Sequence, residues 1–208
     1  MTGDQPVGLG DLADWKRRVG QLYAELRESE LGAAETAARF RSVKDGLFET
    51  HPASPLDAEQ REAFTGLPYF GYREEWRLLG EVDWLEDEPS FVVPLPEGDA
   101  TMRPAADIRF TSPTSGDPLT LRAFWLTGYG GGIFLPFKDA TSATSTYGGG
   151  RYLYDTIKGA DLGFGDHVVL DFNYAYHPSC AYHPRWVCPL APPENVLAEP
   201  IEAGERLS

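Results

Sequence analysis

The sequence predicts a mainly β protein, an antiparallel β-barrel or sandwich with an N-terminal helical pair. Two patterns support this prediction. Apolar residues recur at helical spacing near the start, and short aromatic or branched runs separated by Gly, Pro, Asp and Ser follow from about Trp76. With 208 residues, 42% of them hydrophobic, the chain suits one globular domain with a sizeable core. We expect one structural unit, with helices over residues 1–50 packed on a β domain over residues 51–208 that ends in a proline-rich strap.

The helical pair is predicted from apolar stripes at alternating steps of three and four residues. The first stripe predicts a helix over residues 11–28, with Asp11 and Asp14 near its positive end. A second stripe, from Ala33 to Leu47, predicts a partner helix. This helix should end at "ETHPASP", because the two X-Pro steps there oppose helix. The stretch "SPLDAEQREAF" predicts a short capped helical turn. The first stripe consists of Leu12, Trp15, Val19, Leu22 and Leu26.

Seven short segments have the composition of β-strands. They read "WRLLGEVDWL", "SFVVPL", "ADIRFTS", "PLTLRAFWLTG", "GGIFLPF", "GRYLYDTI" and "DHVVLDFNYAY". In "DPLTLRAFWL" the alternation of side chains predicts one face toward the core and one away from it. One face holds Leu119, Leu121, Ala123 and Trp125, and the other face holds Thr120, Arg122 and Phe124.

The charge of the chain limits its partners. Lysine and arginine number 18 against 32 acidic residues, so the net charge is −14, which repels nucleic-acid phosphates and anionic lipids. No apolar run approaches the ~20 residues that cross a bilayer. The start, "MTGDQPVGLGDLADW", has neither the basic nor the apolar region of a signal peptide. We expect a cytoplasmic protein with a small-molecule partner and no nucleic-acid or membrane partner.

A loop rich in hydroxyl groups is the first candidate site. It lies in "FKDATSATSTYGGGRYL", residues 137–153, where three glycines free the backbone before Arg151. The guanidinium of Arg151 can hold a carboxylate or phosphate with two parallel hydrogen bonds, or it can simply pair with an acidic neighbour. Neither G-x-x-x-x-G-K-[ST] nor G-x-G-x-x-G occurs, so nucleotide binding by those motifs is excluded.

The last strand supplies a second candidate. In "VVLDFNYAY" the alternation predicts Val169, Asp171 and Asn173 on one face. A buried carboxylate needs a cation or several donors, and Arg151 is the expected partner of Asp171. The same pair can also flank a ligand pocket, where Asp171 would act as a base.

The proline-rich strap contains His177, Cys180, His183 and Cys188, four residues of types that zinc accepts. The neighbouring prolines favour an extended geometry in which residues three apart lie about 9 Å from each other, too far for one metal ion. A disulfide between Cys180 and Cys188 and a catalytic thiol with His177 or His183 as base are further alternatives. We expect no cofactor, with zinc as the alternative.

Three stretches resemble the bacterial and archaeal domain-of-unknown-function family 1684. They are "VKDGLFETHPASPLDAEQREAFTGLPYF", "FKDATSATSTYGGGRYL" and "VVLDFNYAYHPSCAYHPRWVCPLAPPEN". The resemblance covers roughly residues 40–205 and implies no established reaction. The family pattern falls here on Asp139, Thr141, Tyr147, Gly150, Arg151, Asp171, Phe172, Asn173, Cys180, Trp186, Cys188 and Asn195.

The chain departs from the family pattern at three positions. His177 and His183 stand where such proteins commonly have asparagine, which indicates that the pattern does not require a zinc quartet. Ala143 stands where a glycine is usual, which argues against an obligatory positive φ at that position.

These observations predict a polar pocket that binds a small anionic or carbonyl-bearing metabolite. Arg151 would clamp the anion and Asp171 is the candidate base. The other expected ligand-binding residues are Asp139, Thr141, Tyr147, Asn173 and Tyr176. A metal-independent hydrolase or isomerase that uses the same pocket is the enzymatic alternative, and a structural or partner-binding domain or a Cys/His zinc site is the other.

Overall fold

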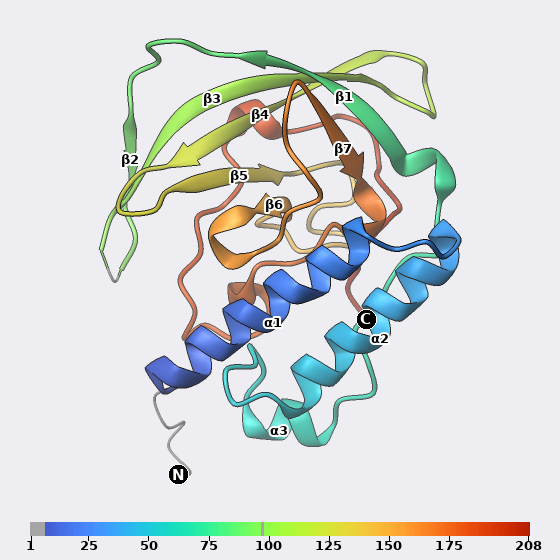
Figure 1. The fold of residues 1–208 in the computed structure, drawn as a ribbon, viewed down its shortest axis with the longest axis vertical. Helices are drawn as coiled ribbons and strands as arrows, with labels where there is room; N and C mark the ends of the chain where they lie inside the picture. The colour runs from blue at the N-terminus through green and yellow to red at the C-terminus, as the bar shows by residue number, and fades with distance from the viewer. Residues whose placement is uncertain (1–6, 97) are drawn as a thin grey trace.

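A computed structural model describes residues 7–96 and 98–208, and its ribbon is shown in Figure 1. Residues 1–6, part of the stretch in which no signal peptide is expected, lie outside the described residues. Within them, seven strands form one curled antiparallel sheet, a half-barrel, in the order β6-β5-β4-β3-β1-β7, and β2 pairs with β3. The strands are β1 (Arg77–Trp84), β2 (Phe91–Val93), β3 (Ala100–Thr111), β4 (Pro118–Leu126), β5 (Gly132–Phe137), β6 (Arg151–Asp155) and β7 (His167–Asp171). The predicted fold class is confirmed.

Two long helices precede the sheet, as the apolar stripes predict. They are α1 (Leu9–Arg27) and α2 (Ala33–Thr50), which run side by side beneath the curled sheet in Figure 1. The short α3 (Ala58–Glu62) follows, and Asp57 caps it by accepting from the backbone of Gln60, while the Gln60 side chain accepts from the Asp57 backbone, both at 2.8 Å. No helix of the described chain is long and apolar enough to cross a membrane.

The helices and the sheet share one hydrophobic core. Leu22 and Tyr23 of α1 and Phe40 of α2 pack in the same cluster as Ile108, Leu121 and other strand residues. Burial of each large apolar side chain is worth roughly 1.5–3 kcal/mol relative to exposure. The helical pair is therefore part of the core rather than an appendage to it.

A second, smaller cluster lies on the other face of the sheet. It contains Met102, Phe124, Phe134, Tyr152 and Cys188, with the strap residues Cys180 and Trp186 packed against it. Phe124 lies on the face opposite Leu121 and Ala123, as the alternation predicts, but it is fully buried because this face is covered too. Trp125, predicted to share the face of Leu121, is 38% exposed.

Beyond β7 the described chain forms short 3-10 turns and extended segments instead of strands. The turns beyond β7 are η3 (Phe172–Tyr174), η4 (Ser179–Ala181) and η5 (Pro193–Asn195), and a further turn, η2 (Thr156–Lys158), lies between β6 and β7. Since β7 ends at Asp171, the predicted strand alternation does not extend to Asn173, which lies in η3. That turn directs Tyr174 back toward the helices, where its ring contacts Phe40.

Candidate functional site

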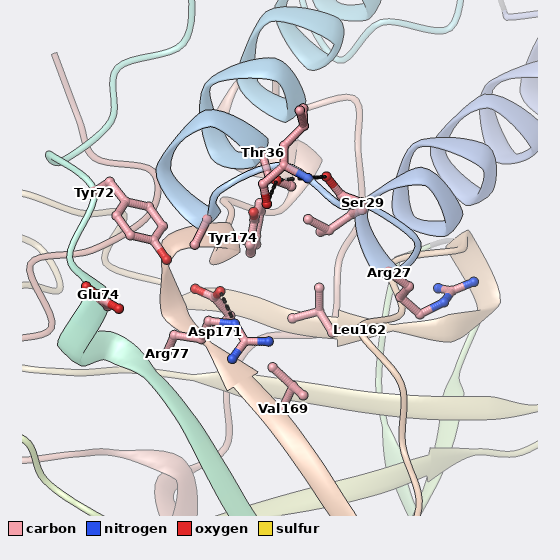
Figure 2. A pocket seen from close by; sticks show the side chains of 13 residues that line it. Arg27, Ser29, Thr36, Tyr72, Glu74, Arg77, Leu162, Val169, Asp171 and Tyr174 are labelled. Atoms are coloured by element: carbon pink, nitrogen blue, oxygen red, sulfur yellow. Dashed lines mark hydrogen bonds and ion pairs between the residues drawn. The ribbon is translucent and has the colours of Figure 1, made fainter.

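A pocket of about 430 Å³ opens where the loop between α1 and α2 faces the ends of β1 and β7. Figure 2 shows it from close by. Of the residues proposed from the sequence, Asp171 lines this pocket. Its walls are Leu26, Arg27, Ser29, Leu31, Ala33, Thr36, Tyr72, Glu74, Arg77, Leu162, Val169, Asp171 and Tyr174.

Strand pairing brings the two main charged groups of the pocket together. Arg77, the first residue of β1, is the cross-strand partner of Asp171, the last residue of β7. One carboxylate oxygen of Asp171 accepts from the backbone N–H of Asn173 at 3.1 Å and from its side-chain amide at 2.9 Å. The other lies 3.5 Å from Nε of Arg77. The two side chains face each other in Figure 2.

Burial makes Asp171 an unusual carboxylate, since only 3% of the residue is exposed. Burial raises its pKa above the ordinary 3.8, and this effect outweighs the donors of Asn173 and the charges of Arg77 and Arg41, which lower it. A raised pKa brings a carboxyl group closer to the range in which it can exchange protons with a ligand.

Tyr72 supplies a donor to the same pocket. Its hydroxyl is buried and has no hydrogen-bond partner in the described chain, and Figure 2 shows it pointing toward Asp171. Burial, and then the charge of Asp171, raise the pKa of Tyr72, so the hydroxyl keeps its proton. A buried donor without a partner costs about 1–3 kcal/mol, which a ligand acceptor or a water would offset.

Arg151 lies away from this pocket, and its predicted pairing with Asp171 is wrong. Its Nη2 lies 2.7 Å from a carboxylate oxygen of Asp139 and donates to the backbone carbonyl of Ile201 at 2.8 Å. Its Nη1 donates to the carbonyls of Ala203 and Glu205. Asp139, in the loop before β6, neutralises the charge of the Arg151 guanidinium, so Arg151 does not need Asp171 as its partner. Arg151 is 1% exposed.

The hydroxyl-rich loop folds around Asp139. Thr141 donates to this carboxylate through its backbone N–H at 2.7 Å and through its hydroxyl, which also contacts the hydroxyl of Thr146. Ala143 has a φ of +66°, so the inference that this position need not adopt a positive φ is wrong. The tight turn back to Thr146, whose carbonyl accepts from the Ala143 N–H at 2.9 Å, requires that conformation.

Two buried asparagine amides replace missing strand pairing. Asn173 accepts from the N–H of Arg73 and donates to its carbonyl, both at 2.8 Å. Asn195 does the same for Arg122 at 2.8 Å and donates also to the carbonyl of Pro136. The predicted ligand-orienting amide of Asn173 is therefore engaged with the backbone and with Asp171.

The four zinc-type residues of the strap do not form one ligand set within the described residues. His177 accepts from the backbone N–H of Tyr147 through Nε2 at 3.2 Å, and burial lowers its pKa to about 4. His183 accepts from the N–H of Arg185. Within residues 7–96 and 98–208, no three His, Cys, Asp or Glu side chains are grouped as metal ligands would be. Cys180 and Cys188 are free thiols.

The remaining two predicted ligand residues lie by the strap. The hydroxyl of Tyr147 is 3.9 Å from the sulfur of Cys180. The ring of Tyr176 packs under the ammonium of Lys44 at 4.6 Å, in a separate, mainly apolar pocket of about 70 Å³ between the helices and the strap. The predicted site residues therefore lie in four separate places. Of these residues, only Asp171 lines the pocket of about 430 Å³.

Sequence reasoning missed three important residues: Arg77, Tyr72 and Glu205. Arg77 and Tyr72 could have been found only by knowing that the start of β1 pairs with the end of β7. Glu205 is fully buried, accepts from the His177 N–H and the Tyr182 hydroxyl at 2.7 Å each, and pairs with Lys44. Burial alone would raise its pKa, but Lys44 and His177 make the net shift a lowering.

Removing the charge of Asp139 tests whether Arg151 is structural. We expect Asp139→Asn to lower the free energy of unfolding in urea by about 3–5 kcal/mol, because the Arg151 cation loses its buried partner. The matched control is Asp107→Asn, which breaks the partly exposed pair with Arg122 and should cost about 1 kcal/mol or less. Equal losses in the two variants would contradict the structural role of Arg151.

Comparison with known proteins places the chain in a family. Among curated proteins, none matches significantly. The chain is similar to an uncharacterised protein of Haloarcula marismortui whose structure was solved by solution NMR, with 33% identity, a TM-score of 0.59, and coverage of 83% of this chain and 93% of that one. A family model matches residues 62–206. The chain therefore belongs to the family described as Protein of unknown function (DUF1684).

Proposed function

We propose that the pocket of Asp171 binds a small anionic or carbonyl-bearing metabolite. The observation that carries the proposal is the unpartnered hydroxyl of Tyr72, which lies with the guanidinium of Arg77 beside a carboxyl group of raised pKa. Two donors that converge beside one another suit an acceptor such as a carboxylate or a carbonyl oxygen.

The charge around the pocket supports an anionic ligand. Arg27 and Arg77 line it, and Arg41 of α2 is near enough to lower the pKa of Asp171. Buried nitrogens of Arg41 also lack a hydrogen-bond partner within the described residues. Glu74 and Asp171 also line the pocket and Asp161 pairs with Arg27, so three guanidinium groups balance three carboxyl groups, and the pocket repels an anion less than the rest of a chain of net charge −14 does.

The walls of the pocket suit a ligand with an apolar body. Leu26, Leu31, Leu162 and Val169 provide apolar surface in the same pocket as the charged groups. Pockets that bind small molecules commonly combine apolar walls with a few convergent polar groups. The clamp assigned to Arg151 from the sequence passes to Arg77 in this proposal, because both Nη atoms of Arg151 already have partners.

Replacing Arg77 tests the binding proposal. Pyruvate and its methyl ester serve as probes, and binding is followed by chemical-shift changes of the protein amides. We expect Arg77→Met to weaken pyruvate binding about ten-fold or more, because a charge-assisted hydrogen bond is lost, and to affect the ester less.

The control for this experiment is Arg109→Met. Arg109 is 53% exposed at its side chain, against 54% for Arg77, but it pairs with Asp83 away from the pocket. Unchanged pyruvate binding in Arg77→Met, or an equal loss in Arg109→Met, would remove the support for this pocket.

A metal-independent isomerase or hydrolase is the second candidate, and the raised pKa of Asp171 favours it. A buried carboxylate can remove a proton next to a ligand carbonyl while Tyr72 and Arg77 stabilise the developing negative oxygen. In D2O, proton NMR of a panel of α-keto acids should show faster exchange of the protons next to the carbonyl with protein than without. Asp171→Asn should abolish the acceleration, whereas an acceleration that survives in this variant counts against Asp171 as the base.

A further inference from the structure

The segment that carries both cysteines is fixed at several points. We call residues 180–188 the cysteine loop. Inside it, Arg185 donates to the carbonyls of Ser54 and Leu56 at 3.0 and 3.1 Å, and the indole of Trp186 donates to the carbonyl of Pro55 at 3.2 Å. These bonds tie the loop to the segment before α3, so the separation of its two ends is set by the fold.

Both ends of the cysteine loop are also anchored. Before Cys180, the backbone N–H of His177 donates to the buried carboxylate of Glu205 at 2.7 Å. After Cys188, the hydroxyl of Tyr152 on β6 donates to the carbonyl of Pro189. The two cysteines are therefore held from opposite sides, and neither depends on a chance loop conformation for its position.

The two thiols meet over the second hydrophobic cluster. Cys188 is 8% exposed and belongs to that cluster, and the partly exposed Cys180 packs against it. The two side chains are close enough for each thiol to shift the pKa of the other. Two cysteines packed on one cluster can form a disulfide if their Cβ atoms approach to about 4 Å, and Cys180 gives solvent access to the pair.

The surroundings favour one thiolate in the pair. The neighbouring Cys180 lowers the pKa of Cys188 to about 6, and the ammonium of Lys158 acts in the same direction. Cys188 in turn raises the pKa of Cys180, as burial does, because a second negative charge beside the first is unfavourable. The pair therefore shares one proton at neutral pH, and a thiolate is the reactive form of cysteine.

We propose that Cys180 and Cys188 form a redox-active dithiol that a hydroperoxide oxidises to an intramolecular disulfide. The thiolate sulfur of the pair attacks one oxygen of hydrogen peroxide and breaks the O–O bond, which leaves a sulfenic acid and hydroxide. The second sulfur then attacks the sulfenic sulfur, the S–S bond forms, and the sulfenic oxygen leaves as water with the proton of the second thiol. In total, two thiols and one hydrogen peroxide give one disulfide and two waters.

The site is distinct from the pocket of Asp171. No residue of the cysteine loop lines that pocket, and the anchors of the loop are the Ser54–Leu56 segment, Glu205 and β6. The dithiol proposal therefore does not rest on ligand binding at Asp171, and either proposal can fail without the other.

The test is oxidation of the reduced full-length protein with one equivalent of hydrogen peroxide at pH 7. Intact mass and peptide mapping should show a monomer about 2 Da lighter, with both thiols lost and a Cys180–Cys188 cross-link that dithiothreitol reverses. The same protein unfolded in urea is the matched control. It should react roughly ten-fold more slowly, because its thiols have ordinary pKa values near 8.5.

Two further measurements test the thiolate and the sulfenic acid separately from disulfide formation. Alkylation of the wild-type protein by iodoacetamide should reach half its maximal rate near pH 6. In Cys180→Ser, peroxide should give a sulfenic acid on Cys188 that dimedone traps. Persistence of both thiols, disulfides formed only between chains, or equal rates in the folded and unfolded protein would overturn the proposal.

Discussion

The buried guanidinium of Arg151 is the constraint on which the C-terminal third of the structure depends. It extends from β6, pairs with Asp139 at 2.7 Å, and donates to the carbonyls of Ile201, Ala203 and Glu205. A buried cation is costly unless its partners are in place, so this group requires the final segment of the chain to pack against the sheet. Ile201, Ala203 and Glu205 of this segment are buried, whereas Arg206 to Ser208 are exposed.

The position of the final segment has consequences for the helices and the strap. It brings Glu205 to a place where its carboxylate pairs with Lys44 of α2 and accepts from the strap at His177 and Tyr182. Sheet, helices and strap are thus joined by two buried charged groups. Asp139 and Arg151, two polar residues of the family pattern, pair with each other in this network. Asp171 instead lines a pocket, with one carboxylate oxygen toward Arg77.

Local patterns predicted the local structure well. The apolar stripes gave both helices, and short aromatic and branched runs gave the seven strands of the described chain, because these signals depend on spacing and composition alone. The errors come from tertiary contacts. Phe124 is buried because the strap covers the second face of the sheet. The partner of Arg151 is Asp139 rather than Asp171, and Arg77 meets Asp171 through a strand register that no sequence pattern specifies.

The central claim concerns Asp171, a buried carboxyl group that faces a pocket. The other buried charges, those of Arg151 and Glu205, are neutralised by Asp139 and Lys44. The most direct measurement is an NMR titration of the Asp171 side-chain carboxyl carbon in the ligand-free protein. The account predicts a pKa above the ordinary value of 3.8, since burial outweighs the donors of Asn173 and the charge of Arg77. A pKa at or below 3.8 would contradict it, because Asp171 would then be a permanently charged partner of Arg77.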